Sequence, residues 1–127
     1  MIVLDTSALL ALLLAEPQAD QIAEILKSEE DFKISAGTLA EALIVAGRRG
    51  LSEEMSLLLE GLAVEVETVS AARAVAVSKA YSTWGKGIHP AGLNFGDCFS
   101  YVTANANGSS LLYVGDDFTQ TDLLSAL

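Results

Sequence analysis

Short apolar runs alternate along this sequence with longer segments in which apolar residues recur every three or four positions. The strand candidates are residues 1–4, 32–34, 64–66 and 111–114. Strands separated by helices pair in parallel, because each crossover returns the chain to the same end of the sheet. The alternation therefore predicts an α/β fold, a three-layer α/β/α sandwich around a central parallel sheet.

Helix candidates fill the intervals between these strands. They span residues 7–15, 18–28, 35–49, 52–62, 70–84 and 94–107. Thr6 or Ser7 can cap the first of them, and Ser35, Ser52 and Asn94 can cap three others. Two helices carry an apolar stripe that we expect to face the core. The stripes comprise Leu39, Leu43 and Ile44 in residues 35–49, and Phe95, Phe99, Val102 and Ala106 in residues 94–107.

Composition limits the class of protein. The chain has 127 residues, 51% of them hydrophobic, and shows no internal repeat or linker, so we expect one domain over residues 1–127. The single cysteine, Cys98, excludes an internal disulfide and is expected to be a small buried side chain. The apolar run at residues 8–15 is too short to span a bilayer, and no basic leader precedes it, so we expect a cytoplasmic protein.

The charge balance is strongly acidic, with 17 acidic residues, 7 basic residues and a net charge of −10. Such a chain lacks the broad basic face with which many proteins bind nucleic acids. A polyanionic substrate would therefore need another source of positive charge. We expect the basic residues to be solvated at the surface, and those considered nearest to a nucleic-acid path are Arg48, Arg49, Arg73, Lys79 and Lys86.

Four acids fall where this fold would gather them. Asp5 ends the first strand and Asp116 follows the last, so both belong to the carboxyl edge of the sheet. Glu41 lies about two turns into the helix after the second strand, and Asp97 lies in the first turn of the helix before the last strand. Ligands of open parallel sheets bind beyond this edge. We therefore expect the four carboxylates to converge there.

Each acid also has a purely structural interpretation. Thr38 to Glu41 match a capping box, in which Glu41 only satisfies the start of a helix. Asp97 in a first helical turn complements the helix dipole. Residues 115–118 fit an ordinary polar turn. Asp5 favours a function, because an acid between a buried strand and an apolar helix is costly to desolvate.

Together, the acids predict a metal site. Carboxylates in one pocket repel each other and take up protons unless a cation neutralises them. Ligation by oxygen alone, without His or Cys, suits Mg²⁺ or Mn²⁺. Such an ion can activate water and stabilise the charge that develops on a phosphodiester. It would also supply the positive charge that the composition lacks.

Four stretches of the sequence resemble the PIN-domain family, and within it the VapC-type toxin ribonucleases of bacterial toxin–antitoxin pairs. They are VLDTSALLALLLAEP at the start, ISAGTLAEALIV around Glu41, HPAGLNFGDCFSYVTA around Asp97 and LLYVGDDFTQTDL near the end. The resemblance implies a PIN fold of strand order 3-2-1-4-5 and a Mg²⁺- or Mn²⁺-dependent endoribonuclease that cuts RNA. It also implies a homodimer, and a cognate antitoxin whose inserted segment blocks the acidic pocket.

The resemblance also assigns roles by position. Asp5 and Asp97 match the principal metal ligands of the family. Glu41 matches the acid that binds a second ion or positions the attacking water. Asp116 matches the less constant fourth acid, although Asp117 beside it leaves this assignment open. Ser7 matches a hydroxyl position that supports the site through hydrogen bonds.

Some residues near the site have both a structural and a functional interpretation. His89 could meet a phosphate or a base, but we expect a structural loop residue. Tyr81 and Trp84 are expected to pack in the core or an interface rather than stack on bases. The apolar segments 8–15 and 57–62 are candidate surfaces for a dimer or antitoxin contact.

Other functions compete with metal-dependent RNA cleavage. A catalytically silent PIN-like module would use the same acids only to bind a metal or a partner. A phosphatase of the haloacid dehalogenase type needs a second Asp two residues after the first, and that position is Ser7. A phospho-receiver domain needs a Lys near its end, and no Lys follows Lys86.

Overall fold

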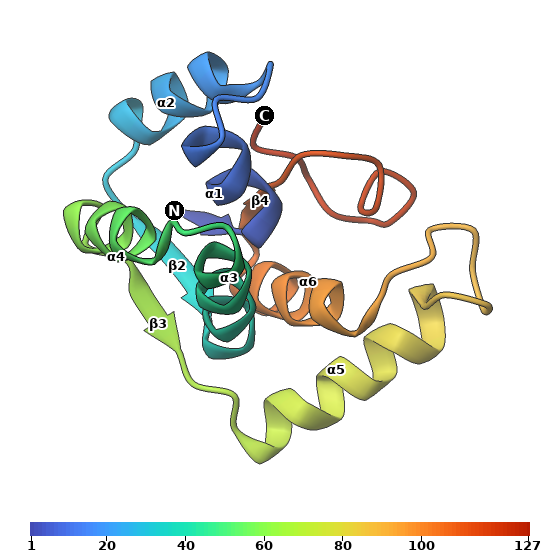
Figure 1. Cartoon of the computed structure of the whole chain (residues 1–127). Coiled ribbons are helices and arrows are strands. Elements are labelled where there is room, and N and C mark those ends of the chain that lie inside the picture. Colours follow the sequence, from blue (N-terminus) through green and yellow to red (C-terminus); the bar gives the residue numbers. More distant parts are fainter.

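A computed structural model describes residues 1–127 and contains one four-stranded parallel sheet (Figure 1). Its strands are β1 (Ile2–Leu4), β2 (Phe32–Ser35), β3 (Glu65–Glu67) and β4 (Ser110–Leu112). They lie in the order β3-β2-β1-β4. Val3 of β1 pairs with Lys33 of β2 on one side and with Leu111 of β4 on the other. Because β1 is an inner strand, the residue that follows it lies within the carboxyl edge of the sheet.

The C-terminal segment pairs with β4 where the order 3-2-1-4-5 would have a fifth strand. Leu111 N donates a hydrogen bond to Leu124 O at 2.9 Å, and Ala126 N donates one to Leu111 O at 2.9 Å. The contact is a single parallel bridge between Leu111 and Ser125 rather than a strand. The outer edge of β4 is thus covered by one bridge of this segment.

Six helices cover the two faces of the sheet, which confirms the three-layer α/β/α architecture. They are α1 (Thr6–Leu13), α2 (Ala19–Ser28), α3 (Ala36–Arg48), α4 (Ser52–Gly61), α5 (Ala71–Trp84) and α6 (Phe95–Asn107). No helix has the length and apolar character that crossing a membrane requires. Leu4 joins a core cluster with α1 to α4, and Val3 joins another with α5 and α6. Neighbouring side chains of a strand point to opposite faces, so β1 contributes to both cores.

Two helices begin differently from the expectation. Asp5, rather than Thr6 or Ser7, is the N-cap of α1, and its Oδ2 accepts a hydrogen bond from Ser7 N at 3.1 Å. A carboxylate is favoured there, because it both accepts from a free helical N–H and complements the helix dipole. Helix α4 has Leu51 as its N-cap, with no side-chain cap, so Ser52 lies one residue inside.

The apolar stripes expected to face the core are wrong at three positions. Leu43, Ile44 and Phe95 have exposed fractions of 40%, 59% and 72%. The buried face of α3 consists of Thr38, Ala42 and Ala46, and that of α6 combines Cys98, Ser100, Thr103 and Ala104 with Tyr101 and with Val102, which the stripe predicted. Short side chains allow these helices to pack closely, so apolar spacing identifies only part of the inner face. The three mispredicted residues form part of the surface.

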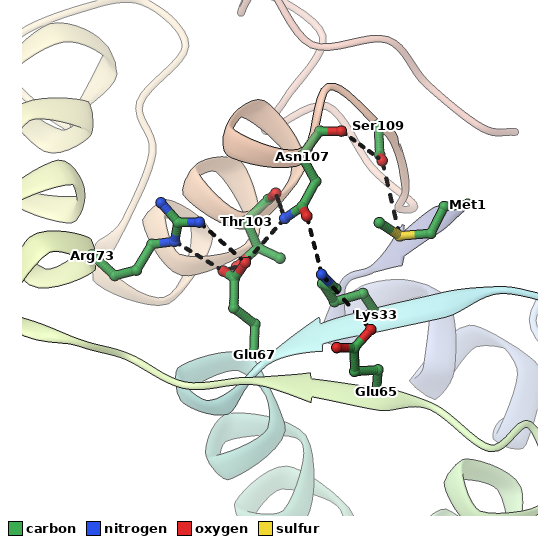
Figure 2. A network of polar contacts seen from close by, with 8 residues as sticks. All are labelled: Met1, Lys33, Glu65, Glu67, Arg73, Thr103, Asn107 and Ser109. Atoms are coloured by element: carbon green, nitrogen blue, oxygen red, sulfur yellow. Dashed lines mark hydrogen bonds and ion pairs between the residues drawn. The ribbon is translucent and has the colours of Figure 1, made fainter.

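A polar network ties β3 to the C-terminal half of α6 (Figure 2). The Glu67 carboxylate accepts hydrogen bonds from Thr103 Oγ1 at 2.8 Å, Asn107 Nδ2 at 3.0 Å and Arg73 Nε at 3.3 Å. Asn107 Oδ1 also accepts one from Lys33 Nζ at 3.0 Å. Burial opposes ionisation of Glu67, but these hydrogen bonds outweigh it and lower its pKa. The network lies far along α6 from Asp97 and holds the scaffold together.

Candidate functional site

Asp5 is delivered to the carboxyl edge by the central strand and fixed there by three hydrogen bonds. Its side chain is only 4% exposed. Oδ2 accepts from Ser7 N at 3.1 Å and from Ser7 Oγ at 2.6 Å, while Oδ1 accepts from Ser100 Oγ at 2.5 Å. These three hydrogen bonds offset the free-energy cost of burying the Asp5 carboxylate away from water.

Ser7 lies between Asp5 and the end of β4. Its Oγ donates to Asp5 and accepts a hydrogen bond from Val114 N at 3.0 Å. The hydroxyl thus links the acid after the first strand to the backbone after the last. This position suits the supporting role expected of Ser7, which stays a prediction.

Glu41 does not form the capping box that was its structural alternative. Ser35 caps α3 instead, since its Oγ accepts a hydrogen bond from Gly37 N at 3.2 Å. Glu41 Oε1 accepts from Thr6 Oγ1 at 2.7 Å, which turns the carboxylate toward the start of α1. Its other oxygen lies against Gly96, where any added Cβ would overlap it. Glu41 therefore bridges the starts of α1 and α6.

Asp97 is both a helix cap partner and a member of the acidic group. Asp97 N donates to Asn94 Oδ1 at 2.8 Å, and Asn94 N donates to Asp97 Oδ2 at 3.0 Å, which completes a capping box. Its side chain is 9% exposed. Burial, together with the charges on Asp117, Asp5 and Glu41, raises the pKa of Asp97 to about 7, against the hydrogen bond from Asn94, which lowers it.

Of the two acids after β4, Asp117 is the one whose charge acts on the site. Of the charges that raise the pKa of Asp97, that of Asp117 has the largest effect, and Asp116 does not contribute. Asp116 begins a turn in which its carbonyl accepts hydrogen bonds from Thr119 N at 3.2 Å and Thr119 Oγ1 at 2.7 Å. Asp117 therefore contributes to the electrostatics of the site, and whether it or Asp116 is the fourth acid stays a prediction.

The donor set suits a hard cation that keeps part of its water. No three His, Cys, Asp or Glu side chains are arranged to hold one ion together. An ion here would therefore take few protein oxygens and retain water or substrate oxygens, as Mg²⁺ commonly does. Asp5 Oδ1 keeps one free lone pair, and Asp97 Oδ1 accepts no hydrogen bond at all, because each carboxylate accepts only the hydrogen bonds described above. These two oxygens are the candidate ligands.

Three hydroxyl residues at the site were not identified from the sequence. Thr6 holds Glu41, Ser100 holds Asp5, and Thr38 Oγ1 lies 3.0 Å from Ser100 Oγ. All three are buried. Thr6 adjoins Asp5 in the chain, while Thr38 and Ser100 stand three residues from Glu41 and Asp97 on the same helices. Residues three positions apart share a helix face, so these hydroxyls lie on the same face as the acids. The spacing of apolar residues does not reveal this pattern.

The remaining candidates have structural roles. Burial, with the nearby Asp97 charge, raises the pKa of the Cys98 thiol to about 11, so this buried side chain is unreactive. His89 Nδ1 accepts a hydrogen bond from Ala91 N at 3.0 Å, and its ring packs edge-on against Trp84 at 4.8 Å between centroids. Arg73 is engaged by Glu67.

Both the sequence and the fold resemble known proteins. The PIN domain family model matches residues 2–124. The chain is 42% identical over 124 residues to the VapC ribonuclease Mb0640 of Mycobacterium bovis, with 95% of each chain covered.

Two solved structures are similar in fold. One is VapC20 of Mycobacterium tuberculosis, described as a toxin that cleaves the sarcin-ricin loop. It has a TM-score of 0.78 and 17% identity, covering 99% of this chain and 98% of that one. The other is a toxin–antitoxin complex from Klebsiella pneumoniae, with a TM-score of 0.74 and 18% identity, covering 96% of this chain and 93% of that one.

Proposed function

The chain belongs to the PIN-domain family and to its VapC branch, and from this premise we propose that it is a Mg²⁺- or Mn²⁺-dependent endoribonuclease, the toxin of a toxin–antitoxin pair. The observation that carries the proposal is the convergence of Asp5, Glu41 and Asp97 at the carboxyl edge, where Glu41 lies against Gly96 beside Asp97 and the charges of Asp117, Asp5 and Glu41 raise the pKa of Asp97. Acids that hinder each other's ionisation favour a bound cation.

The residues divide the chemistry between them in this proposal. Asp5 and Asp97 hold the cation, which when bound stabilises charge on a phosphodiester and favours ionisation of water. Glu41 is held at Oε1 by Thr6, and its Oε2 accepts no hydrogen bond from the chain. We propose that this free oxygen orients the attacking water and accepts its proton. Asp117, or Asp116 beside it, completes the acidic group.

The acidic composition is consistent with this division of roles. The cation neutralises carboxylates that would otherwise repel RNA phosphates. We propose that Arg48, Arg49, Lys79 and Lys86, which are exposed and have no acidic partner, contact the RNA backbone. Such contacts position a nucleic acid without specifying its sequence.

Two protein partners belong to the same proposal. The negative charge of these acids is complementary to a Lys or Arg of an antitoxin, which would compete with the cation for Asp5 and Asp97. A second copy of the chain would cover the α3–α6 face, defined by the exposed side chains of Ile44 and Phe95. A groove of about 280 Å³ lies there, lined by Ile44, Phe95 and Glu41 among others. Exposed large apolar side chains of this density favour a protein contact.

The test is cleavage of a panel of structured RNAs by the purified chain with Mg²⁺ or Mn²⁺, with sequencing of the new 5′ ends. We expect Asp5→Asn and Asp97→Asn each to reduce cleavage by at least about 100-fold. The control is Asp20→Asn, an exposed acid on α2, which should cleave like the parent chain. Cleavage that survives both site variants contradicts the proposal. Metal and antitoxin binding without any cleavage would instead support the catalytically silent module.

A further inference from the structure

Three buried side chains from three elements form a hydrogen-bonded line into the site. Thr38 of α3 lies 3.0 Å from Ser100 of α6 between their hydroxyl oxygens, and Ser100 Oγ donates to Asp5 Oδ1 at 2.5 Å. Thr38 and Ser100 each have an exposed fraction of 0%. We call this pair of hydroxyls the Thr38–Ser100 relay.

The direction of each hydrogen in the relay follows from counting donors. An ionised carboxylate only accepts, so Ser100 must give its single hydroxyl hydrogen to Asp5. Ser100 then has no hydrogen left for Thr38, and Thr38 Oγ1 must be the donor in their contact. The relay therefore points two hydrogens in sequence toward Asp5.

The same count applies to the lone pairs of Asp5. Oδ2 accepts from both the amide and the hydroxyl of Ser7, which occupies its two lone pairs. Oδ1 accepts only from Ser100 and keeps one lone pair. Asp5 is thus restricted to a single open position, on Oδ1, and the direction of that position depends on where Ser100 is held.

We infer that Thr38 and Ser100 are positioning residues that fix the one open position of Asp5 and thereby set the affinity of the site for its divalent cation. The inference rests on the metal site of the proposed function. Neither residue touches the cation or the RNA. Ser100 orients Asp5 directly, and Thr38 acts by fixing Ser100, as outer hydrogen-bond partners commonly do for metal ligands.

Packing alone does not account for these hydroxyls. The two helices already approach closely through glycine, since a Cβ at Gly37 would lie 2.5 Å from the ring of Phe99. Val at position 38 would keep the side-chain shape and remove only the hydrogen bond to Ser100, so packing does not require a hydroxyl at this position. Burying two hydroxyls costs desolvation energy that apolar side chains avoid, so their arrangement toward Asp5 indicates a function at that carboxylate.

The test is calorimetric titration of the metal-free chain with Mn²⁺, in Thr38→Val and Ser100→Ala variants. Asp5→Asn identifies the binding event that belongs to the site. We expect Ser100→Ala to weaken Mn²⁺ binding by about 10- to 100-fold. Thr38→Val keeps the shape of the side chain but removes the donor to Ser100, so we expect a loss of about fivefold. Thr38→Ser restores the hydroxyl and should restore most of the affinity.

The matched control is Thr103→Val, on the same helix as Ser100. Thr103 is also buried and also donates to a carboxylate, but its acceptor is Glu67 in the network of Figure 2. We expect Thr103→Val to lower the free energy of unfolding and leave Mn²⁺ affinity unchanged. Should Ser100→Ala fail to fold, the comparison of Thr38→Val with Thr38→Ser decides alone.

Two outcomes separate this inference from the proposed function. Parental Mn²⁺ affinity in folded Thr38→Val and Ser100→Ala would overturn the relay, whether or not the chain cuts RNA. An equal loss of affinity in Thr103→Val would also overturn it, because the effect would then be general. Loss of affinity in the relay variants alone supports the relay, even if no RNA is cleaved and the proposed function fails.

Discussion

Two acids at the carboxyl edge, Asp5 and Glu41, are fixed by short hydroxyl side chains. Asp5 is held by Ser7 and Ser100, and Glu41 by Thr6. Short hydroxyl side chains have few rotamers, so they hold a carboxylate with little loss of conformational entropy. Rigidity of this kind is what a metal site needs, because ligands must already point to the ion.

The glycine beside Glu41 gives the first prediction at this scale. We expect Gly96→Ala to displace the Glu41 carboxylate, because the added Cβ would overlap Oε2. RNA cleavage should fall by about tenfold or more, as it does when a catalytic group is misplaced by about 1 Å. The control is Gly61→Ala in α4, where an added Cβ meets nothing within 4 Å. Equal cleavage rates in the two variants would contradict the role given to Glu41.

A second prediction concerns the pH dependence of Asp97. Its folded pKa of about 7 lies above the ordinary value of 3.8, so between these values the folded chain binds more protons than the unfolded chain. The free energy of unfolding of the metal-free protein should therefore fall as pH rises from 4 to 7. After allowance for solvent screening, we expect a loss of at most about 2 kcal/mol.

The measurement is urea unfolding in EDTA at several pH values, on the parent chain and on Asp97→Asn. The Asn variant lacks the titrating group, so this part of the slope should disappear. Excess Mn²⁺ should also reduce the slope in the parent chain, because a bound cation favours the ionised carboxylate. An unchanged slope in Asp97→Asn would mean that other groups cause it.

At the scale of elements, α6 connects two separate polar systems. Its first turn carries Asp97 and its middle carries Ser100, both at the site, whereas Thr103 and Asn107 bind Glu67 at the end of β3. The helix is anchored to the sheet at its far end by this network (Figure 2). The network thus stabilises the helix that presents the site without taking part in its chemistry.

We predict that Glu67→Gln lowers stability without changing cleavage chemistry. The folded pKa of Glu67 is lowered, so its ionised form contributes stability above the ordinary carboxyl pKa, and the contribution is lost as pH falls through the folded value. At pH 7 the variant should lose roughly 1–2 kcal/mol of unfolding free energy, with a smaller difference in acid. Chemical denaturation at the two pH values measures this, with the exposed Glu53→Gln as control.

The order of elements could be predicted from sequence, because alternation of strands and helices leaves few topologies. The grouping of Asp5, Glu41 and Asp97 also followed from their places at strand and helix ends. The inner faces of α3 and α6 could not be predicted from apolar spacing. The close packing of these helices places Thr38, Ala42 and Ser100 in the interior and leaves several larger apolar side chains at the surface. The hydrogen bonds from buried hydroxyls to acids depend on tertiary structure. In the sequence their only sign is a hydroxyl residue three positions from an acid on the same helix.

At the scale of the whole molecule, one apolar surface lies beside one acidic site. The α3–α6 face carries Ile44 and Phe95, and the groove there also reaches Glu41. A second copy on this face would bring its own surface next to the acids. A dimer formed through this face would therefore change how RNA reaches the acids.

We predict that Ile44→Glu converts a dimer of the chain to a monomer, because a charge would be buried at the contact. Leu57→Glu is the matched control, since Leu57 is 60% exposed on α4, outside the α3–α6 face. Light scattering coupled to size exclusion gives the mass of each variant. Dissociation by Leu57→Glu but not by Ile44→Glu would move the interface to α4, the other surface that the sequence suggested.

The central claim is that the clustered acids work through a divalent cation held by Asp5 and Asp97. Its most direct test is the rate of RNA cleavage as a function of Mn²⁺ concentration, in the parent chain and in Asp5→Asn. We predict that the parent chain does not cleave RNA in EDTA and that its rate saturates with Mn²⁺. Asp5→Asn should show little or no cleavage at the same Mn²⁺ concentrations. Cleavage independent of Mn²⁺, or the same Mn²⁺ dependence in Asp5→Asn, would contradict it.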